Sequence, residues 1–361
     1  MEAIRIENLS FRYRNRSTKA LDGVDLSVGQ GEYVVVAGEA GAGKSTLCLT
    51  LNGLIPRFLK GELSGKVLIL GEEVGEVSRM AKNVGLVFQD FESQLFSTSV
   101  RLEVAFFPEN LGMGREEIEK RIRSSLAQVG LEHGERRRPT SLSGGEKQRL
   151  AIASILSGSP PILVMDEPSS DLDPLGRSQL LGILNNLKEG GETLVVVEHE
   201  VEDMLGADRM VLMKGGKVVA DGQPRHLLQD PGLLEANGLR PIPLTQVFNE
   251  EKPPITCDEG LAIAERKRVG IKETEYRRII EGRRMLESNY GEVIIEVEGL
   301  RHVYEEGIEG LSGIQLTVRR GELVAICGEN GSGKTTLAKH LNGLLLPTEG
   351  EVRVKGDPTS K

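Results

Sequence analysis

A glycine-rich motif that occurs twice constrains this chain more than any other feature of its sequence. Both copies fit G-x-x-x-x-G-K-[ST], and each follows a run of apolar residues, at 33–37 in the first copy and 323–327 in the second. The pattern predicts a strand, a loop and a helix whose backbone N–H groups surround a polyphosphate. Glycines let the backbone approach the phosphates, and the positive end of the following helix favours the anion. One copy could be an ordinary glycine-rich turn before a helix, but two copies in the same context predict a nucleotide-binding protein.

The motif also names the residues that are expected to contact phosphate. In the first copy they are Gly38, Glu39, Ala40, Gly41, Ala42, Gly43, Lys44, Ser45 and Thr46. In the second copy they are Gly328, Glu329, Asn330, Gly331, Ser332, Gly333, Lys334, Thr335 and Thr336. Within the first loop we expect Lys44 to reach the β- and γ-phosphates and Ser45 to ligate Mg²⁺.

Two adjacent acids follow another apolar run, at residues 162–165. Hydrolysis needs a carboxylate for the metal and a base for the water, both at strand ends near the loop. Because successive strand residues point to opposite faces, Asp166 and Glu167 are able to take different roles. We expect Asp166 to hold Mg²⁺ through its water shell and Glu167 to orient and polarise the attacking water. The alternative is a strand that ends in two solvated acids, and the position downstream of the first loop favours the catalytic interpretation.

The next apolar run, at residues 193–197, leads to His199. A histidine at a strand end beside a phosphate site is able to donate to the γ-phosphate and to hold the water and the glutamate in register. A surface histidine at a strand terminus is the alternative, which would be favoured if this run stood alone.

Residues 143–146 have the pattern of a capped helix start that contains two glycines. Ser143 is placed as the N-cap and Glu146 at the third helical position. Two glycines in a first turn cost about 1 kcal/mol each relative to alanine, and capping alone does not require them. Close approach of the backbone to an anion does require them, so Ser143, Gly144 and Gly145 are predicted to form a second phosphate contact.

The order of these motifs resembles the ATP-binding cassette (ABC) family of ATPases over about residues 2–230. The positions that carry the resemblance are 38–46, Gln89, 142–146, 162–168, 170–173 and His199. It implies ATP and Mg²⁺ as cofactors, and two cassettes that face each other head to tail with ATP between the first loop of one and residues 143–145 of the other. Tyr13 matches the aromatic residue that stacks on adenine, and Gln89 the residue that links Mg²⁺ and water to the partner. Glu146 stands where many members have Gln, outside the phosphate contacts.

The resemblance also implies the fold class, an α/β P-loop NTPase of the ABC type. This fold has a mostly parallel sheet as its core, an antiparallel β subdomain and a helical subdomain, here with a partial second copy. We expect a complete cassette at residues 1–235, a proline-rich linker leading into a charged helix at 236–291, and part of a second cassette at 292–361. An interaction helix is the alternative for the charged stretch. The predicted catalytic residues are Glu167, His199 and Gln89, and the predicted metal ligands are Ser45, Gln89 and Asp166.

The second copy lacks counterparts of most of these motifs. Tyr304 parallels Tyr13, but the sequence ends at Lys361 before any counterpart of Gln89 or of the paired acids. A parallel sheet without its central strands leaves unpaired edges and an uncovered apolar face. We therefore expect either a truncated sequence, which we favour, or a fragment that folds only marginally.

Composition indicates an ordinary soluble globular protein, with 39% hydrophobic and 27% charged residues among 361. No apolar run approaches the roughly 20 residues that span a bilayer, and no N-terminal signal is recognisable. Cys48, Cys257 and Cys327 share no metal or redox spacing, and we expect Cys48 and Cys327 to be buried, reduced thiols of a cytosolic protein. A net charge of −9 argues against a nucleic-acid partner.

An aromatic cluster follows Gln89. Its members are Phe88, Phe91, Phe96, Phe106 and Phe107. Such a cluster is more often core than interface, but its mixture with polar residues favours a groove that accepts a partner's helix. Residues 94–112, together with the tandem motifs, resemble the ATPases of energy-coupling factor (ECF) importers, which take up vitamins and transition-metal ions.

These observations together predict an ATP-hydrolysing subunit that energises such an importer, as a peripheral protein on the cytoplasmic face of the cell membrane. The expected partners are a transmembrane transporter subunit, a substrate-binding membrane subunit, and a second cassette in a homodimer or heterodimer. A soluble ABC-family ATPase switch without a membrane partner is one alternative. A nucleotide-binding module that does not hydrolyse is another, against which the complete motif set in residues 1–230 argues.

Overall fold

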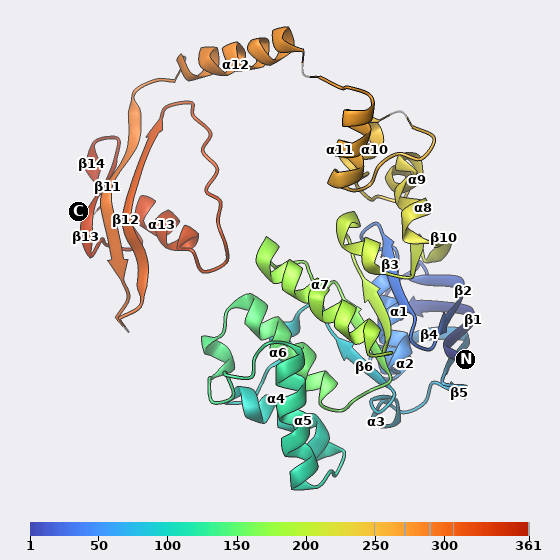
Figure 1. Ribbon diagram of the computed structural model, residues 1–361. Helices are drawn as coiled ribbons and strands as arrows, with labels where there is room; N and C mark the ends of the chain where they lie inside the picture. The colour runs from blue at the N-terminus through green and yellow to red at the C-terminus, as the bar shows by residue number, and fades with distance from the viewer. Residues whose placement is uncertain (249, 271, 289, 306, 360–361) are drawn as a thin grey trace. The chain divides into compact units, whose positions relative to one another are not determined.

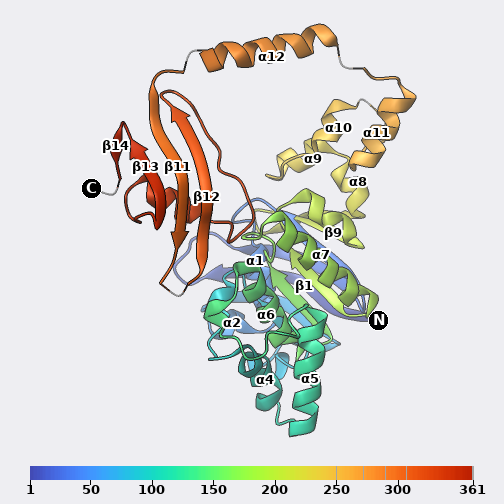
Figure 2. The same cartoon turned by 60° about the vertical axis from the view of Figure 1, so that its left-hand side comes forward.

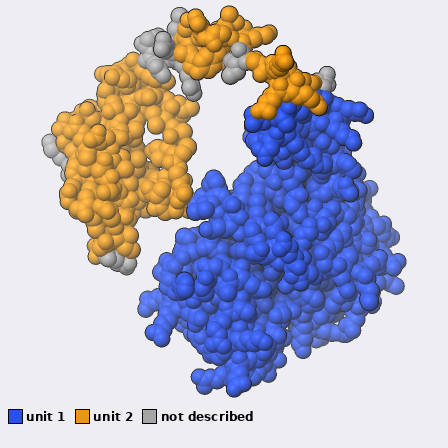
Figure 3. All heavy atoms as spheres, in the orientation of Figure 1, with its two compact units in different colours: residues 1–263 blue, residues 264–361 orange. Residues whose placement is uncertain are grey.

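Figure 1 shows the computed structural model, which describes residues 1–248, 250–270, 272–288, 290–305 and 307–359. The chain divides into two compact units, Met1–Ile263 and Ala264–Lys361, which Figure 3 colours separately. Among the described helices, none combines the length and the apolar character that crossing a bilayer requires.

The first unit contains an antiparallel sheet in the order β2-β1-β4-β5. Its strands are β1 (Glu2–Tyr13), β2 (Leu21–Gly29), β4 (Gly61–Ile69) and β5 (Glu72–Glu73). Buried and more exposed residues alternate along β2, as expected for a strand with one face on a core and one face in solvent. At the end of β1, Tyr13 pairs with Gly61. This sheet therefore carries the predicted adenine-stacking residue at one end.

Six strands form the central sheet, in the order β10-β9-β3-β8-β7-β6. They are β3 (Tyr33–Gly38), β6 (Val84–Val87), β7 (Ile162–Asp166), β8 (Thr193–Val197), β9 (Arg209–Lys214) and β10 (Lys217–Gly222). The pairings are parallel except that of β10 with β9. β3, β7 and β8 are buried along their whole length, which explains their nearly continuous apolar sequences. Because parallel strands end at one edge, the segments that follow these three strands emerge on the same side of the sheet.

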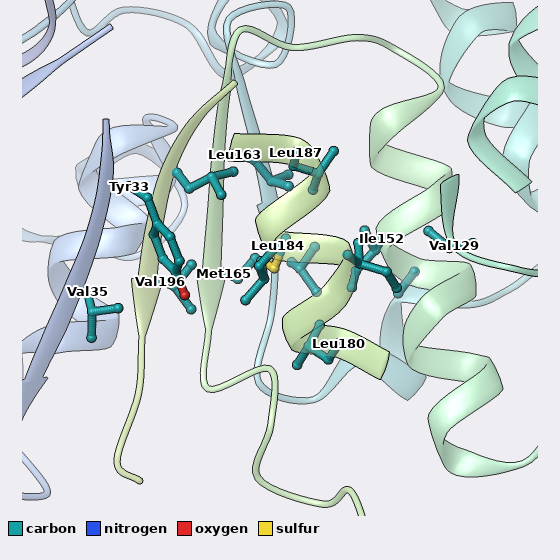
Figure 4. Packing of buried hydrophobic residues seen from close by; sticks show 14 of the residues in the cluster. Tyr33, Val35, Val129, Ile152, Leu163, Met165, Leu180, Leu184, Leu187 and Val196 are labelled. Carbon is teal, nitrogen blue, oxygen red and sulfur yellow. The ribbon is translucent and has the colours of Figure 1, made fainter. Parts of the chain in front are cut away.

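Helices and the antiparallel sheet cover the two faces of the central sheet. On one face, Leu47 and Cys48 of α1 (Lys44–Leu51) share a core with the antiparallel sheet, so the prediction that Cys48 is buried is confirmed. The other face packs against α6 (Gly144–Leu156) and α7 (Pro174–Glu189). Figure 4 shows Tyr33 and Met165 of the sheet in this second cluster with Leu184 of α7.

A helical region adjoins this core and contains α4 (Val100–Asn110), α5 (Arg115–Gln128) and α6 (Figures 1 and 2). The apolar stripe that the sequence predicts on α5 packs inward, with Ile122 and Leu126 buried and Ile118 against the same core. The mostly parallel core, the antiparallel sheet and the helical region together confirm the fold class predicted from the sequence.

The first unit also contains several short helices. They are α2 (Leu54–Arg57), α3 (Val77–Met80), α8 (Pro224–Leu228), α9 (Pro231–Ala236), α10 (Pro243–Val247), α11 (Cys257–Arg266), which continues past the boundary between the units, and 3₁₀ turns at Phe91–Gln94, Pro139–Ser141 and Val201–Gly206. Within residues 236–263, Leu239, Ile242 and Ile255 are buried in the core of this unit. Pro243 begins α10 instead of interrupting structure, because a first helical position needs no N–H donor.

The second unit contains a small antiparallel sheet in the order β12-β11-β13-β14. Its elements are α12 (Glu273–Ser288), β11 (Val293–Val303), β12 (Glu309–Arg319), α13 (Lys334–Leu341), β13 (Glu349–Val354) and β14 (Asp357–Pro358). The apolar run at 323–327 forms no strand, although all of its residues are described, and Leu323 is 96% exposed. The predicted strand, and with it the predicted burial of Cys327, are therefore wrong. The physical reason is that no strand in the described part of this unit pairs with the run.

Candidate active site

The first glycine-rich loop joins β3 to α1 and has backbone angles that favour glycine. Gly38 and Gly43 have φ values of 143° and 103°. A Cβ atom on Gly38 would lie 2.1 Å from the carbonyl oxygen of Met213, and one on Gly43 would lie 2.3 Å from that of Ala20. Gly41 also has a positive φ, 80°, but a Cβ atom there would meet nothing within 4 Å. Gly38 and Gly43 thus allow the loop to pack closely against neighbouring backbone, while the backbone at Gly41 is accessible to a ligand.

Lys44 begins α1 inside this loop and is only 4% exposed. Its Nζ donates to the carbonyl oxygens of Gly38 at 2.8 Å and Glu39 at 2.9 Å. Burial lowers the pKa of Lys44, and the nearby carboxylates of Glu167 and Asp166 oppose that shift. The loop therefore holds a positive charge in partly desolvated surroundings, where its attraction for a phosphate is strong.

Asp166 ends β7 and faces the start of α1. Burial raises the pKa of Asp166, and the hydroxyl of Ser45 opposes the shift. The Oδ1 atom of Asp166 is buried and has no hydrogen-bond partner among the described residues. An unpartnered carboxylate oxygen beside a hydroxyl fits a hard divalent cation such as Mg²⁺. No cluster of three or more His, Cys, Asp or Glu side chains arranged for a metal occurs in the described ranges, so water and phosphate oxygens would supply the other ligands.

Glu167 lies between the two other predicted catalytic residues. Its Oε2 accepts a hydrogen bond from Gln89 Nε2 at 2.8 Å, and its Oε1 lies 2.6 Å from His199 Nε2. Gln89 follows β6, Glu167 follows β7 and His199 follows β8, so three adjacent strands of the sheet supply the group. The structure thus brings together three residues that the sequence selected separately.

These residues surround a cavity of about 610 Å³. The predicted residues that line it are Tyr13, Ala40, Gly41, Gly43, Lys44, Ser45, Thr46, Gln89, Glu167 and His199. Four further lining residues were missed from the sequence: Arg16, Thr18, Lys19 and Ala20. They lie in the segment between Tyr13 and β2, and two cations close to a predicted phosphate site were a signal that could have identified them.

Tyr13 stands at one side of this cavity. Its hydroxyl lies 3.1 Å from Thr46 Oγ1, and its ring meets Phe11 edge to face with 4.8 Å between centroids. Both contacts restrict the ring at the cavity edge, in a position where a planar base could stack on it.

Ser143, Gly144 and Gly145 do not line the cavity. Ser143 caps α6 as predicted: its Oγ accepts from Glu146 N at 3.3 Å, and Glu146 Oε2 accepts from Ser143 N at 2.8 Å. A Cβ atom on Gly144 would meet nothing within 4 Å, and one on Gly145 would meet only Leu172, at 3.6 Å. Packing within the chain therefore does not require either glycine.

A buried acid that the sequence analysis missed directly precedes His199. Glu198 is 2% exposed, and its Oε2 accepts a 2.6 Å hydrogen bond from Ser169 Oγ. Burial raises the pKa of Glu198 to about 7, with the bond from Ser169 opposing the shift and Asp203 adding to it. The signal in the sequence was an acid placed at the end of an apolar strand run, next to a candidate catalytic residue.

The second glycine-rich loop repeats the local contacts of the first. Lys334 Nζ donates to the carbonyl oxygens of Gly328 at 2.8 Å and Glu329 at 2.7 Å, and the Tyr304 hydroxyl lies 2.9 Å from Thr336 Oγ1. No strand that ends in a pair of acids stands beside this loop in the described residues of its unit. Among the described residues of this unit, the local contacts of the loop are thus present without counterparts of Asp166 and Glu167.

Comparison with known proteins identifies the family of this chain. The family model for ABC transporters matches residues 21–170 and 311–361. A putative ABC transporter ATP-binding protein of Caldanaerobacter subterraneus is 49% identical over 364 residues, which cover 98% of this chain and 64% of that protein. A putative ABC transporter ATP-binding protein of Pyrococcus abyssi is 47% identical over 244 residues, covering 66% of this chain and 87% of that protein. The chain belongs to the ABC transporter family.

Two solved structures are similar in fold to part of this chain. CbiO1 from Clostridium perfringens, described as part of the ABC transporter complex CbiONQ, has a TM-score of 0.59 at 30% identity and covers 68% of this chain and 98% of its own. A dimeric ATP-binding cassette in a post-hydrolysis state with ADP and phosphate bound has a TM-score of 0.54 at 30% identity, covering 62% of this chain and 99% of its own. By contrast, the chain spans only 64% of the length of its Caldanaerobacter relative.

Proposed function

We propose that this chain binds ATP with Mg²⁺ in the cavity of the first unit and hydrolyses it. The observation that carries the proposal is the placement of Glu167 between Gln89 and His199, at the edge of a cavity that Lys44 also lines. A complete cassette at residues 1–235, as expected from the sequence, would contain all of these groups.

Phosphate binding and metal binding are assigned to the loop and to the end of β7. Lys44 and the loop N–H groups bind the β- and γ-phosphates. Ser45 and Asp166 would hold Mg²⁺, with Gln89 as a further ligand, and the ion would neutralise charge on the phosphate oxygens. The buried, unpartnered Oδ1 of Asp166 supports this assignment.

Activation of water is assigned to Glu167. Its carboxylate accepts a hydrogen bond from a water molecule and polarises that water toward the γ-phosphate. His199, whose Nε2 lies 2.6 Å from Glu167 Oε1, holds the carboxylate in place and is able to contact the γ-phosphate. Gln89 holds the other carboxylate oxygen.

Replacing the carboxylate by an amide tests this proposal. Glu167→Gln retains the loop and should bind ATP with near wild-type affinity, but it should hydrolyse ATP at least roughly 100-fold more slowly, since general-base catalysis contributes about that factor or more. Nucleotide titration and phosphate release measure the two effects. Wild-type turnover in this variant would remove Glu167 from the assigned role.

We further propose that two cassettes enclose ATP, with Ser143, Gly144 and Gly145 of one completing the cavity of the other. Two glycines that packing among the described residues does not require, at a helix start, where the helix dipole favours an anion, support an approach from outside the chain. Ser143→Arg should leave ATP binding by the monomer unchanged but prevent ATP-dependent dimerisation of the Glu167→Gln protein. Ser124→Arg, on the outer side of α5, is the matched control and should still dimerise. Weakened monomer binding in Ser143→Arg would contradict this proposal.

The proposed role is to energise an ECF-type importer of a vitamin or a transition-metal ion, at the cytoplasmic face of the membrane. A groove of about 330 Å³ supports a membrane partner, and the aromatic cluster contributes Phe88, Phe96, Phe106 and Phe107 to its lining. Phe96 and Phe106 are 62% and 47% exposed and meet edge to face with 4.7 Å between centroids. Exposed aromatic pairs in a groove suit the apolar face of a partner helix. The CbiO1 neighbour, part of a transporter complex, supports the same role.

Co-purification from membranes tests the partner. Phe106→Asp should abolish recovery of a transmembrane subunit and a substrate-binding membrane subunit while ATP hydrolysis by the isolated chain is retained. Leu175→Asp, at a similarly exposed apolar position on α7, is the matched control and should retain both subunits. If the wild-type chain recovers no membrane subunit, the chain acts instead as a soluble ATP-dependent switch.

A further inference from the structure

Glu167 has an unfavourable backbone conformation. Its φ is +51°, in the left-handed region that a residue with a Cβ atom rarely adopts. Such a conformation persists only where the surrounding structure holds it, and it is frequent at functional sites. The contacts that hold this residue therefore decide where its carboxylate points.

Two of these contacts are made by Glu167 itself. Its N–H donates to the carbonyl oxygen of Val197 at 3.1 Å, and its own carbonyl oxygen accepts from Ser170 Oγ at 2.7 Å. The first contact extends the pairing of β7 with β8 by one residue, and the second closes the turn that follows. Neither contact ties the far side of that turn to the neighbouring strand.

The bond between Ser169 and Glu198 makes that tie. Ser169 belongs to the turn after Glu167, whereas Glu198 directly follows β8, and both are 2% exposed. The Glu198 backbone is fixed as well, because its N–H donates to the carbonyl oxygen of Val36 in β3 at 3.1 Å. Since His199 is the next residue, this buried side-chain bond joins the turn that carries Glu167 to the segment that carries His199, in addition to the direct contact between those two side chains at 2.6 Å.

We propose that Glu198 and Ser169 are positioning residues whose hydrogen bond holds the Glu167 carboxylate in register with His199. Neither residue lines the cavity, so neither is assigned a contact with nucleotide. The inference rests on the proposed ATP hydrolysis. It adds a pair of buried residues that position the groups lining the cavity without lining it themselves.

The chemistry of the pair favours this role over simple packing. A buried carboxyl group is unfavourable in itself, and Glu198 Oε1 and the hydroxyl of Tyr33 are buried without a hydrogen-bond partner among the described residues. Arg177, a cation whose charge acts on Glu198, forms an ion pair with Asp203 at 3.4 Å. An acid that lowers the stability of the fold is expected at a position where it contributes to the reaction.

The test measures ATP hydrolysis and ATP binding in the full 361-residue chain. Ser169→Ala and Glu198→Ala should each lower kcat at least tenfold while KM and the ATP dissociation constant stay within about threefold of wild type. The double variant should be no slower than the slower single variant, because both remove the same bond. Glu198→Gln keeps an oxygen that accepts a hydrogen bond from Ser169, so its kcat should be at least tenfold higher than that of Glu198→Ala. A loss of packing alone would not explain this difference.

Ser157→Ala is the matched control. Ser157 is also fully buried, and its hydroxyl donates to the Ser154 carbonyl oxygen at 2.7 Å, but it lies at the end of α6 away from the cavity. This control should lose stability without losing kcat. If Ser169→Ala retains a kcat within twofold of the Ser157→Ala value, the positioning role is overturned, and this holds even if Glu198→Ala fails to fold. The proposed hydrolysis is tested separately, because it fails only if the wild-type chain is inactive or Glu167→Gln remains active.

Discussion

The two glycine-rich loops of this chain have the same internal contacts in different surroundings. In both, the lysine Nζ donates to two loop carbonyl oxygens at 2.7–2.9 Å, and the tyrosine hydroxyl lies about 3 Å from a threonine Oγ1. The first loop follows β3, which is buried between β8 and β9. The second follows residues 323–327, which are not in a strand, and Leu323 is 96% exposed.

This difference separates what a motif specifies from what a sheet supplies. The loop conformation follows from nearby residues, namely glycines at positive φ and a lysine that closes on its own loop. The acid, amide and histidine of the first site come from three other strand ends, which only a parallel sheet brings together. The conformation of a phosphate-binding loop is therefore determined by nearby residues, whereas a hydrolytic site depends on the tertiary fold.

Amide hydrogen exchange should show the largest contrast between the two regions. The amides of Val35 and Val36 should exchange roughly 10⁴-fold more slowly than those of Ala325 and Ile326, because only the first pair lies in a paired strand. Amides of β11, which pairs with β12 and β13, serve as the internal control and should be protected. Equal protection at 35–36 and 325–326 would show that the second loop also follows a stable strand.

Shortening the first unit should give the next largest effect. A chain of residues 1–263 should keep the stability of the first unit, whereas residues 1–235 should lose on the order of 5 kcal/mol, because Leu239, Ile242 and Ile255 leave the core. Urea unfolding of both chains measures this difference. Equal midpoints and equal slopes would mean that residues 236–263 add nothing to the fold of the first unit.

Glu198 should make the stability of the first unit depend on pH. Its pKa is raised in the folded state from 4.5 to about 7, so the folded state binds more protons than the unfolded state in this range and stability falls as pH rises through it. Glu198→Gln should therefore be more stable than wild type by about 3 kcal/mol at pH 8. The gain should shrink toward zero near pH 4.5, and a gain that does not vary with pH would contradict this origin.

His340 should give the stability of the second unit a smaller pH dependence, of the opposite sign to that expected from Glu198. Burial and the neighbouring His302 lower the pKa of His340, so the unfolded state takes up the proton first and stability falls as pH decreases through 6.5. The corresponding residue of the first unit is Thr50, which does not titrate in this range. His340→Thr should remove the loss of thermal stability between pH 7.5 and pH 5.5, and an unchanged loss would assign it to other groups.

The sequence predicted the parts of the site that depend on local patterns. The loop, the capped start of α6, and Glu167 and His199 after their apolar runs follow from short strings with a chemical reason at each position, whereas Gln89 was indicated by the family resemblance. It did not predict the positive φ of Glu167 or the Ser169–Glu198 bond, because both arise where separate strands meet. It also placed Cys327 in a buried strand, since an apolar run indicates a strand only where a partner strand exists to pair with it.

The most direct test of this contrast compares the two loop lysines in the full chain. Lys44→Ala should lower ATP hydrolysis by more than roughly 100-fold, because it removes the charge that we propose to contact the β- and γ-phosphates, in the loop that shares a cavity with Gln89, Glu167 and His199. Lys334→Ala should change the rate by less than about twofold, although its loop has the same internal contacts. A comparable loss of hydrolysis in both variants would show that the second loop forms a working site. That result would contradict the distinction between the first loop as a hydrolytic site and the second as a phosphate-binding loop alone.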